Sequence, residues 1–229
     1  MLEDLKKKSA LFLIFSNLIP LYGVLYQNWD AFWIVLLYWI ENLIIGFFNV
    51  LRMIFVRVSN PIENLGKLLM IPFFIFHYGA FCGGHGLFIM ALFRKDPGSL
   101  FDKPTWPFFF VFIELLVNVI KKVLEIFPQE MIIPFIALFL SHGFSFVYNF
   151  FIKEEFKNTN SKDLMGKPYT RIVVLHIAII AGAFPVMYFG SPVYLLVVLI
   201  LIKIIIDLYL HNKEHKKLQM KQISTGDNS

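Results

Sequence analysis

Several stretches of this chain are apolar enough, and long enough, to cross a lipid bilayer. Hydrophobic residues make up 58% of the 229 residues, and 27 residues are phenylalanine. The mean hydropathy is +0.67, a value that ordinary soluble domains do not approach. A transmembrane helix needs about 17 to 25 mostly apolar residues. The sequence therefore predicts an all-α, polytopic transmembrane bundle.

Six segments satisfy that length requirement, and a seventh segment differs from them. The six are 10–27, 31–57, 65–93, 131–152, 170–189 and 192–210. The seventh segment, 107–127, carries its polar residues on one helical face while apolar residues occupy the rest. Such a helix either lies in the membrane interface or spans as a seventh helix, and we expect the interfacial position. The residues of its polar face are Glu114, Asn118, Lys121, Lys122 and Glu125.

The distribution of basic residues predicts the orientation of the bundle. If 107–127 stays on the outer side, six crossings place 15 of the 21 Lys and Arg residues in cytoplasmic segments, as the positive-inside rule requires. We therefore expect a single domain, 1–229, in the cell membrane, with both termini in the cytoplasm and a partly disordered tail at 210–229. Contact of the basic loops with anionic membrane lipids accounts for the net charge of +5, so no nucleic-acid partner is needed.

Four of the six histidines and one glutamate fall inside the apolar segments, where ionisable groups are expensive and commonly functional. They are Glu41, His77, His85, His142 and His176. A rise of about 1.5 Å per residue places Glu41, His77 and His142 near the membrane midplane. The same count places His176 nearer the cytoplasm and His85 nearer the outer surface. We expect the three midplane residues to form the centre of one polar site.

Helical spacing predicts which faces of the helices meet. Tyr38, Glu41 and Asn42 lie on a polar stripe of the second span, and His142 and Asn149 lie on a similar stripe of the fourth. Because two polar stripes are not tolerated in lipid, they are expected to face each other or a cavity. Small residues four positions apart predict close helix packing on the third and fifth spans. These pairs are Gly79 with Gly83, and Ala178 with Gly182.

A carboxylate with several imidazoles at one depth is a ligand set for Zn²⁺ or iron. The first hypothesis is an intramembrane metal site with Glu41, His77 and His142 as ligands. His176 would be a fourth ligand or a general base, and a metal-bound water would be the nucleophile of a hydrolase. In that hypothesis Glu41 and His176 are the catalytic residues.

Other uses of the same residues remain open. A proton- or cation-coupled transporter or channel would carry ions past Glu41 and the histidines, along a path bounded by Arg171, Lys203 and Asp207. A haem with two axial histidines would take His77 and His142. Each histidine is also explained as a hydrogen-bonded packing residue, and Glu41 by pairing with Arg171, Lys203 or a histidine.

Three short segments resemble the hallmark segments of a prokaryotic family of multi-pass membrane proteins that is classed only as a domain of unknown function. They are Tyr38-Trp39-Ile40-Glu41-Asn42, His77-Tyr78-Gly79-x-Phe81, and Pro168-Tyr169-x-Arg171 with His176. The similarity extends from the second span through the fifth. It implies that the polar helix positions are family features, and it brings no known activity, substrate or cofactor. Independently of the resemblance, we expect five further polar residues in the site: Tyr38, Asn42, His85, Asn149 and Arg171.

Overall fold

The computed structural model describes residues 18–56, 61–93, 106–159, 161–166, 168–191 and 193–205. Within these ranges the chain forms helices and no strand. Contacts divide the chain into two compact units, 32–179 in one and 1–31 with 180–229 in the other. The predicted tail at 210–229 lies outside the described residues.

Four helices in the described ranges are long and apolar enough to cross a membrane: Ala31–Phe55, Asn64–Leu92, Gln129–Ile152 and Leu164–Phe189. The prediction of an all-helical membrane protein is therefore confirmed, with four of the six predicted spans. The helices of these spans are α2 (Ala31–Phe55), α3 (Pro61–Leu92), α5 (Ile132–Ser145) with the π-helix η4 (Phe146–Ile152), and α8 (Tyr169–Phe189). Shorter helices complete the unit: η2 (Phe108–Phe110), α4 (Val111–Ile126), η3 (Gln129–Met131), α6 (Glu155–Asn158) and α7 (Ser161–Gly166).

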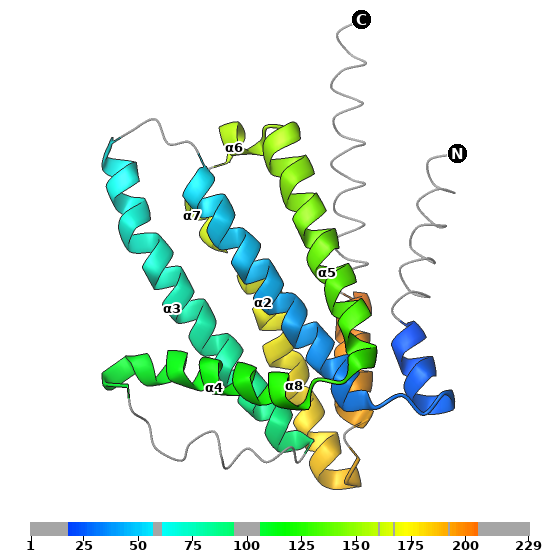
Figure 1. The fold of residues 1–229 in the computed structure, drawn as a ribbon. Helices are drawn as coiled ribbons and strands as arrows, with labels where there is room; N and C mark the ends of the chain where they lie inside the picture. Colours follow the sequence, from blue (N-terminus) through cyan, green and yellow to red (C-terminus); the bar gives the residue numbers. More distant parts are fainter. Residues whose placement is uncertain are drawn as a thin grey trace, which may run out of the picture. The chain divides into compact units, whose positions relative to one another are not determined.

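Helix α2 is the centre of the 32–179 unit (Figure 1). Inside the unit, 56% of the most apolar stretch of α2 is buried, against 6% for the span that contains α5. Buried aromatic side chains hold α2 to its neighbours, and the indole N–H of Trp39 donates to the backbone oxygen of Cys82 on α3 at 2.8 Å. The outer helices consequently leave broad apolar faces for lipid, as a bundle in a membrane requires.

The helices alternate in direction. Phe47 contacts Phe139 and Phe55 contacts Phe151, so residue numbers rise together along α2 and α5. Phe74 contacts Tyr169 and Phe81 contacts His176, so α3 and α8 also run in one direction. Trp39 and Cys82 belong to α2 and α3, which run oppositely (Figure 1). The end of α2 and the starts of α3 and α8 thus share one end of the unit.

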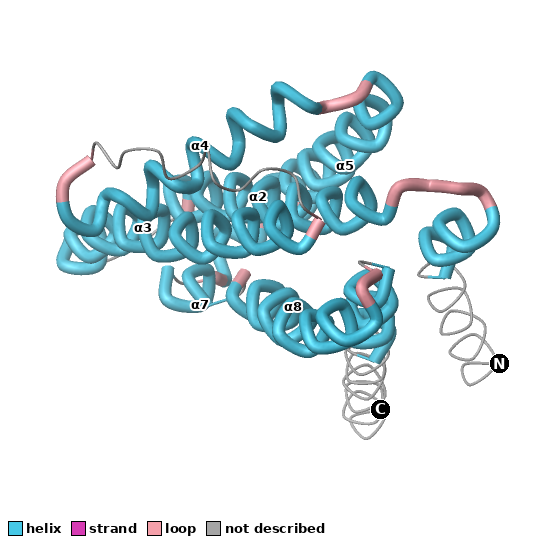
Figure 2. The backbone as a smooth tube through the Cα atoms, turned by 90° about the horizontal axis from the view of Figure 1, so that it is seen from below, coloured by secondary structure: helices cyan, strands magenta, loops and turns pink. Residues whose placement is uncertain are grey.

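Helix α4 crosses α2 and α3 near their other end (Figure 1), and it lies on the opposite side of them from α7 (Figure 2). It packs against a row of glycines on α3. A Cβ atom on Gly79 would come within 3.1 Å of Ile113, and one on Gly83 would come within 3.1 Å of the backbone nitrogen of Leu116. The predicted close approach at Gly79 and Gly83 is confirmed, with α4 as the helix that approaches.

One residue of the predicted polar face of α4 points inward. Glu114 is buried, and its Oε2 accepts a hydrogen bond from the backbone N–H of Trp106 at 3.1 Å. The polar residues predicted on this face therefore differ in burial, since Lys121 and Glu125 are exposed. Helical spacing alone does not predict this difference, because it says nothing about the turn before the helix. A backbone N–H in that turn donates to the carboxylate.

The other unit contains a helix at 18–26 and the helix Val193–Ile205, together with the end of α8. A Cβ atom on Gly182 would lie 3.0 Å from the Cα atom of Leu195, which confirms the close packing predicted there. Gly190, with φ of +70°, ends α8 in the left-handed conformation that glycine favours. The predicted spans 10–27 and 192–210 extend into residues that the structure does not describe.

The packing of α4 against the glycines of α3 leads to a prediction about stability. A Cβ atom on Gly86 would lie 2.6 Å from Val119 on α4 and 2.9 Å from the indole of Trp39, and both of those side chains are fully buried. We expect Gly86→Ala to cost about 1–3 kcal/mol, because overpacking shifts buried groups. Thermal unfolding in detergent measures the cost. Gly84→Ala is the matched control, since a Cβ atom on Gly84 would meet nothing within 4 Å, and equal melting temperatures for the two variants would contradict the prediction.

Candidate functional site

Glu41 lies where three helices meet. The guanidinium Nη1 of Arg171 on α8 donates to Oε1 of Glu41 at 2.8 Å. The Nε2 atom of His142 on α5 lies 3.4 Å from the same oxygen, longer than a normal hydrogen bond but close enough for electrostatic attraction. The side chain of Glu41 is 16% exposed and that of Arg171 is 51% exposed. We call these three residues the Glu41 cluster.

The position where α8 starts explains how Arg171 reaches Glu41. Apolar length alone predicts Arg171 at the cytoplasmic boundary of a span beginning at 170, whereas in the structure Tyr169, the first residue of α8, lies beside His77 in the middle of α3. The backbone N–H of Arg171 donates to the carbonyl of Pro168, which starts α8. Arg171 therefore lies level with the middle of α3, and its long side chain extends to Glu41 on α2.

His77 bonds to a tyrosine rather than to Glu41. Its Nδ1 atom lies 2.8 Å from the hydroxyl of Tyr169, the residue two positions before Arg171. The neighbouring Tyr78 donates its hydroxyl proton to the backbone oxygen of Asn42 at 2.9 Å. The side-chain amide of Asn42 donates to the backbone oxygen of Tyr38. The His77 bond thus joins α3 to α8, and the Tyr78 bond joins α3 to α2 beside the Glu41 cluster.

His85 and His176 form a pair of imidazoles. Nε2 of His85 lies 2.9 Å from Nδ1 of His176. His85 is only 5% exposed, and its buried Nδ1 has no hydrogen-bond partner among the described residues. The prediction that His176 lies nearer the cytoplasm and His85 nearer the outer surface is wrong, because the two rings are in contact. Because Tyr169 at the start of α8 lies beside His77, His176 seven positions later reaches the level of His85.

The first half of α8 thus makes three polar contacts with the rest of its unit. Tyr169 meets His77, Arg171 meets Glu41, and His176 meets His85. We call this set the α8 seam. Its ends, Tyr169 and His176, are seven positions apart, which is about 10 Å along a helix. A continuous series of polar contacts along that length is unusual in an apolar layer, where such groups mark functional sites.

The proposed metal ligands are brought together only in part. Glu41 and His142 are adjacent, whereas His77 and His176 have other partners. In the described part of the chain, no group of three or more His, Cys, Asp or Glu residues is arranged to hold a metal ion. Asn149 in η4 donates to the hydroxyl of Ser145, the last residue of α5. Binding of Zn²⁺, iron or haem stays a prediction.

Tyr78 and Tyr169 are the residues that helical patterning missed. Tyrosine is common in apolar segments, so neither hydroxyl stood out from the aromatic background. The only signal was the occurrence of both residues in the short segments that carry the family resemblance. Their bonds to Asn42 and His77 place them in the site.

The Glu41 cluster predicts a non-additive pair of substitutions. Arg171→Gln removes the cation that compensates Glu41, and we expect a loss of about 1.5–3 kcal/mol, the usual size for a charged hydrogen bond. Glu41→Gln with Arg171→Gln leaves no uncompensated carboxylate, so the double variant should be more stable than Arg171→Gln alone. Chemical unfolding in detergent gives both values. Strictly additive losses would show that the two side chains do not interact.

A model of a family of unknown function (DUF6498) matches residues 1–224. Searches among curated proteins and among solved structures found no match. The matched range contains the Glu41 cluster and the whole α8 seam. The chain belongs to this family of unknown function.

Proposed function

We propose that this membrane protein conducts or transports protons or small cations, with Glu41 as the group that binds them. The observation that carries the proposal is the placement of one carboxylate oxygen between a permanent cation and a titratable imidazole. Arg171 lies 2.8 Å from Oε1 of Glu41 and His142 lies 3.4 Å from it. Such arrangements inside a membrane mark ion pathways and proton relays.

The charges of the Glu41 cluster support this function. An ionised Glu41 and the guanidinium of Arg171 neutralise each other, so the cluster is tolerated in the apolar layer without a further ion. A proton that arrives on His142 or on Glu41 changes that balance by one unit charge. The cluster therefore distinguishes a protonated from an unprotonated state by a large electrostatic energy.

The cluster also connects proton binding to the packing of helices. Glu41 belongs to α2, His142 to α5 and Arg171 to α8. Protonation of Glu41 weakens the charge-assisted bond that holds α8 to α2. Transport requires two helix arrangements whose energies depend on the bound ion. The bond between Glu41 and Arg171 is a contact on which such a change would act.

The proposed topology has six spans, with residues 107–127 in the outer interface and both termini in the cytoplasm of the cell. The alternation of α2, α3, α5 and α8 supports it, because it places Arg52, Lys67 and Lys153 toward one end of the unit. Helix α4 crosses at the other end (Figure 1). The positive-inside rule then assigns the first end to the cytoplasm.

Flux measurements test the transport proposal. Protein in liposomes with a trapped pH-sensitive dye should dissipate an imposed pH gradient, and Glu41→Gln should reduce that rate to the level of protein-free liposomes. Glutamine has the shape of glutamate, but its amide group neither gains nor loses a proton in the pH range of the assay. Glu41→Asp, which keeps a carboxylate, should retain measurable flux. Glu130→Gln, at an exposed site in η3, is the control, and wild-type flux from Glu41→Gln would refute the proposal.

A metal site is the second candidate, and one distance favours it. Two ligand atoms at about 2.0–2.1 Å from a tetrahedral zinc ion lie about 3.3 Å apart. Oε1 of Glu41 and Nε2 of His142 are 3.4 Å apart. Water molecules would complete the coordination, and a metal-bound water would supply the nucleophile of a hydrolase.

Elemental analysis of the purified protein tests the metal proposal. We expect zinc or iron to co-purify with the wild type and to be lost from the double variant Glu41→Ala, His142→Ala, because both proposed ligands are then absent. A variant that replaces His211 and His215 by alanine controls for binding by the terminal histidines. Metal contents that do not differ between wild type and the Glu41, His142 variant would exclude this site.

A further inference from the structure

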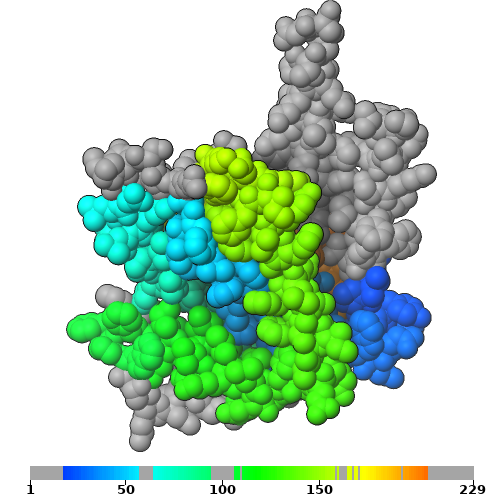
Figure 3. All heavy atoms as spheres, turned by 45° about the horizontal axis from the view of Figure 1, so that its top comes forward, coloured from blue at the N-terminus to red at the C-terminus, as the bar shows by residue number. Residues whose placement is uncertain are grey.

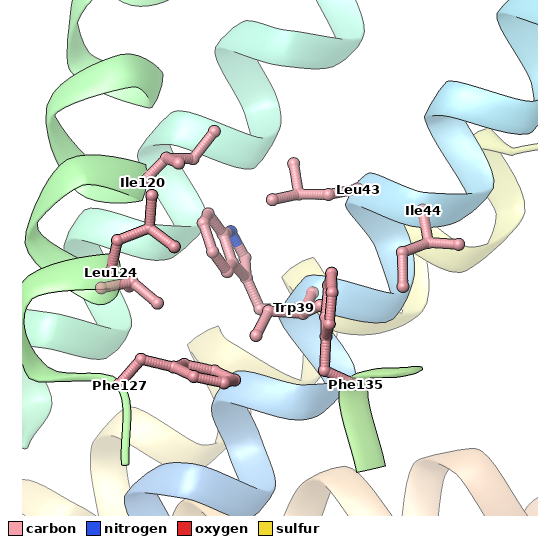
Figure 4. A pocket seen from close by; sticks show the side chains of 9 residues that line it. Trp39, Leu43, Ile44, Ile120, Leu124, Phe127 and Phe135 are labelled. Atoms are coloured by element: carbon pink, nitrogen blue, oxygen red, sulfur yellow. The ribbon is translucent and has the colours of Figure 1, made fainter. Parts of the chain in front are cut away.

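A cavity of about 230 Å³ lies between α2, α4 and α5, and Glu41 does not line it. Figure 4 shows Trp39, Leu43 and Ile44 reaching into it from α2, with Ile120 and Leu124 opposite them on α4. Phe127 and Phe135 close the side where α4 is followed by α5.

The lining contains no group that would bind a polar ligand. All nine lining residues are apolar, and the one polar atom among their side chains, the indole N–H of Trp39, already donates to the backbone of Cys82. A dry apolar cavity binds apolar molecules. Its volume is about that of eight water-sized groups, so it would hold a segment of hydrocarbon chain.

The cavity has a buried floor and an exposed mouth. Trp39 and Val123, on its floor, are 1% and 4% exposed. Leu124 and Phe135 also line it but are 68% and 37% exposed, so the opening lies beside them, between α4 and α5. The space-filling view shows the surface of α2 between these two helices (Figure 3). In a membrane, lipid chains surround this opening.

A basic residue stands next to the mouth. Lys121 is exposed and lies three positions before Leu124, so the two side chains are neighbours on the surface of α4. The next residue, Lys122, is 3.7 Å from Glu125, so of the two lysines we assign Lys121 to the opening. Helix α4 is the amphipathic helix expected in the interface, the level at which lipid phosphates lie.

We propose that this cavity binds an acyl chain of an anionic phospholipid, whose phosphate is held by Lys121 at the surface of α4. The chain enters beside Leu124 and ends against Trp39. The lipid would fasten the end of α4 to α2 and α5. This site does not depend on ion binding at Glu41.

Native mass spectrometry of the full chain in detergent, with phosphatidylglycerol or phosphatidylcholine added, tests the proposal. We expect the wild type to retain phosphatidylglycerol and Leu124→Trp to lose it, because the larger ring blocks the mouth. Leu140→Trp, an equally exposed leucine on α5 outside the cavity, should bind as the wild type does. Lys121→Gln should weaken phosphatidylglycerol binding by about fivefold, the effect of one basic residue, and leave phosphatidylcholine unchanged.

A second measurement locates the chain. In a variant with Trp29, Trp33 and Trp106 replaced by phenylalanine, Trp39 is the remaining tryptophan, and phosphatidylglycerol with brominated acyl chains should quench its fluorescence. The proposal is overturned if the wild type retains no lipid, if Leu124→Trp and Leu140→Trp retain it equally, or if Trp39 is not quenched. Equal loss of both lipids in Lys121→Gln overturns the role of Lys121, and retention of an uncharged hydrocarbon instead overturns the choice of phospholipid.

Discussion

The compensation of Glu41 by Arg171 is the contact on which the polar interior of this protein depends. An ionised carboxylate inside hydrocarbon is tolerated only with a partner, and the partner comes from a helix 130 residues away in the chain. Bringing α8 to α2 for this purpose also brings Tyr169 to His77 and His176 to His85. The polar side chains of α3 that face α8 thereby gain their partners together with Glu41.

This arrangement divides the helices of the 32–179 unit into two kinds. Helices α2, α3 and α4 are held by close apolar packing, through glycines on α3 and the buried ring of Trp39. The first half of α8 also buries apolar residues such as Ile172 and Leu175, but it differs in adding the side-chain polar contacts of the α8 seam. Packing contacts are insensitive to charge, whereas the seam contacts change with the ionisation of their members. A change of charge would therefore act on α8 before it acted on the packing of α3 with α4.

Much of this fold could be predicted from the sequence because the constraints are local. Apolar length identified the four described spans, and small residues four positions apart identified the surfaces at Gly79, Gly83 and Gly182 where helices touch. Depth counting brought Glu41 and His142 to the same level, and they are adjacent. It failed for His176, because α8 starts beside His77 in the middle of α3 and not beside the start of α3. The pairing of Glu41 with Arg171 rather than with another cation depends on tertiary packing, which a single sequence does not record.

The π-helix after His142 has a consequence for how α5 meets α2. Phe151 follows His142 by nine residues, about two and a half turns of an α-helix, which would direct the two side chains to opposite sides. In the structure both reach α2, His142 at Glu41 and Phe151 at Phe55. The wider turns of η4 rotate the second half of the helix back toward its neighbour. Because of this local unwinding, α5 and η4 together make a polar contact at the middle of α2 and an aromatic contact at its end.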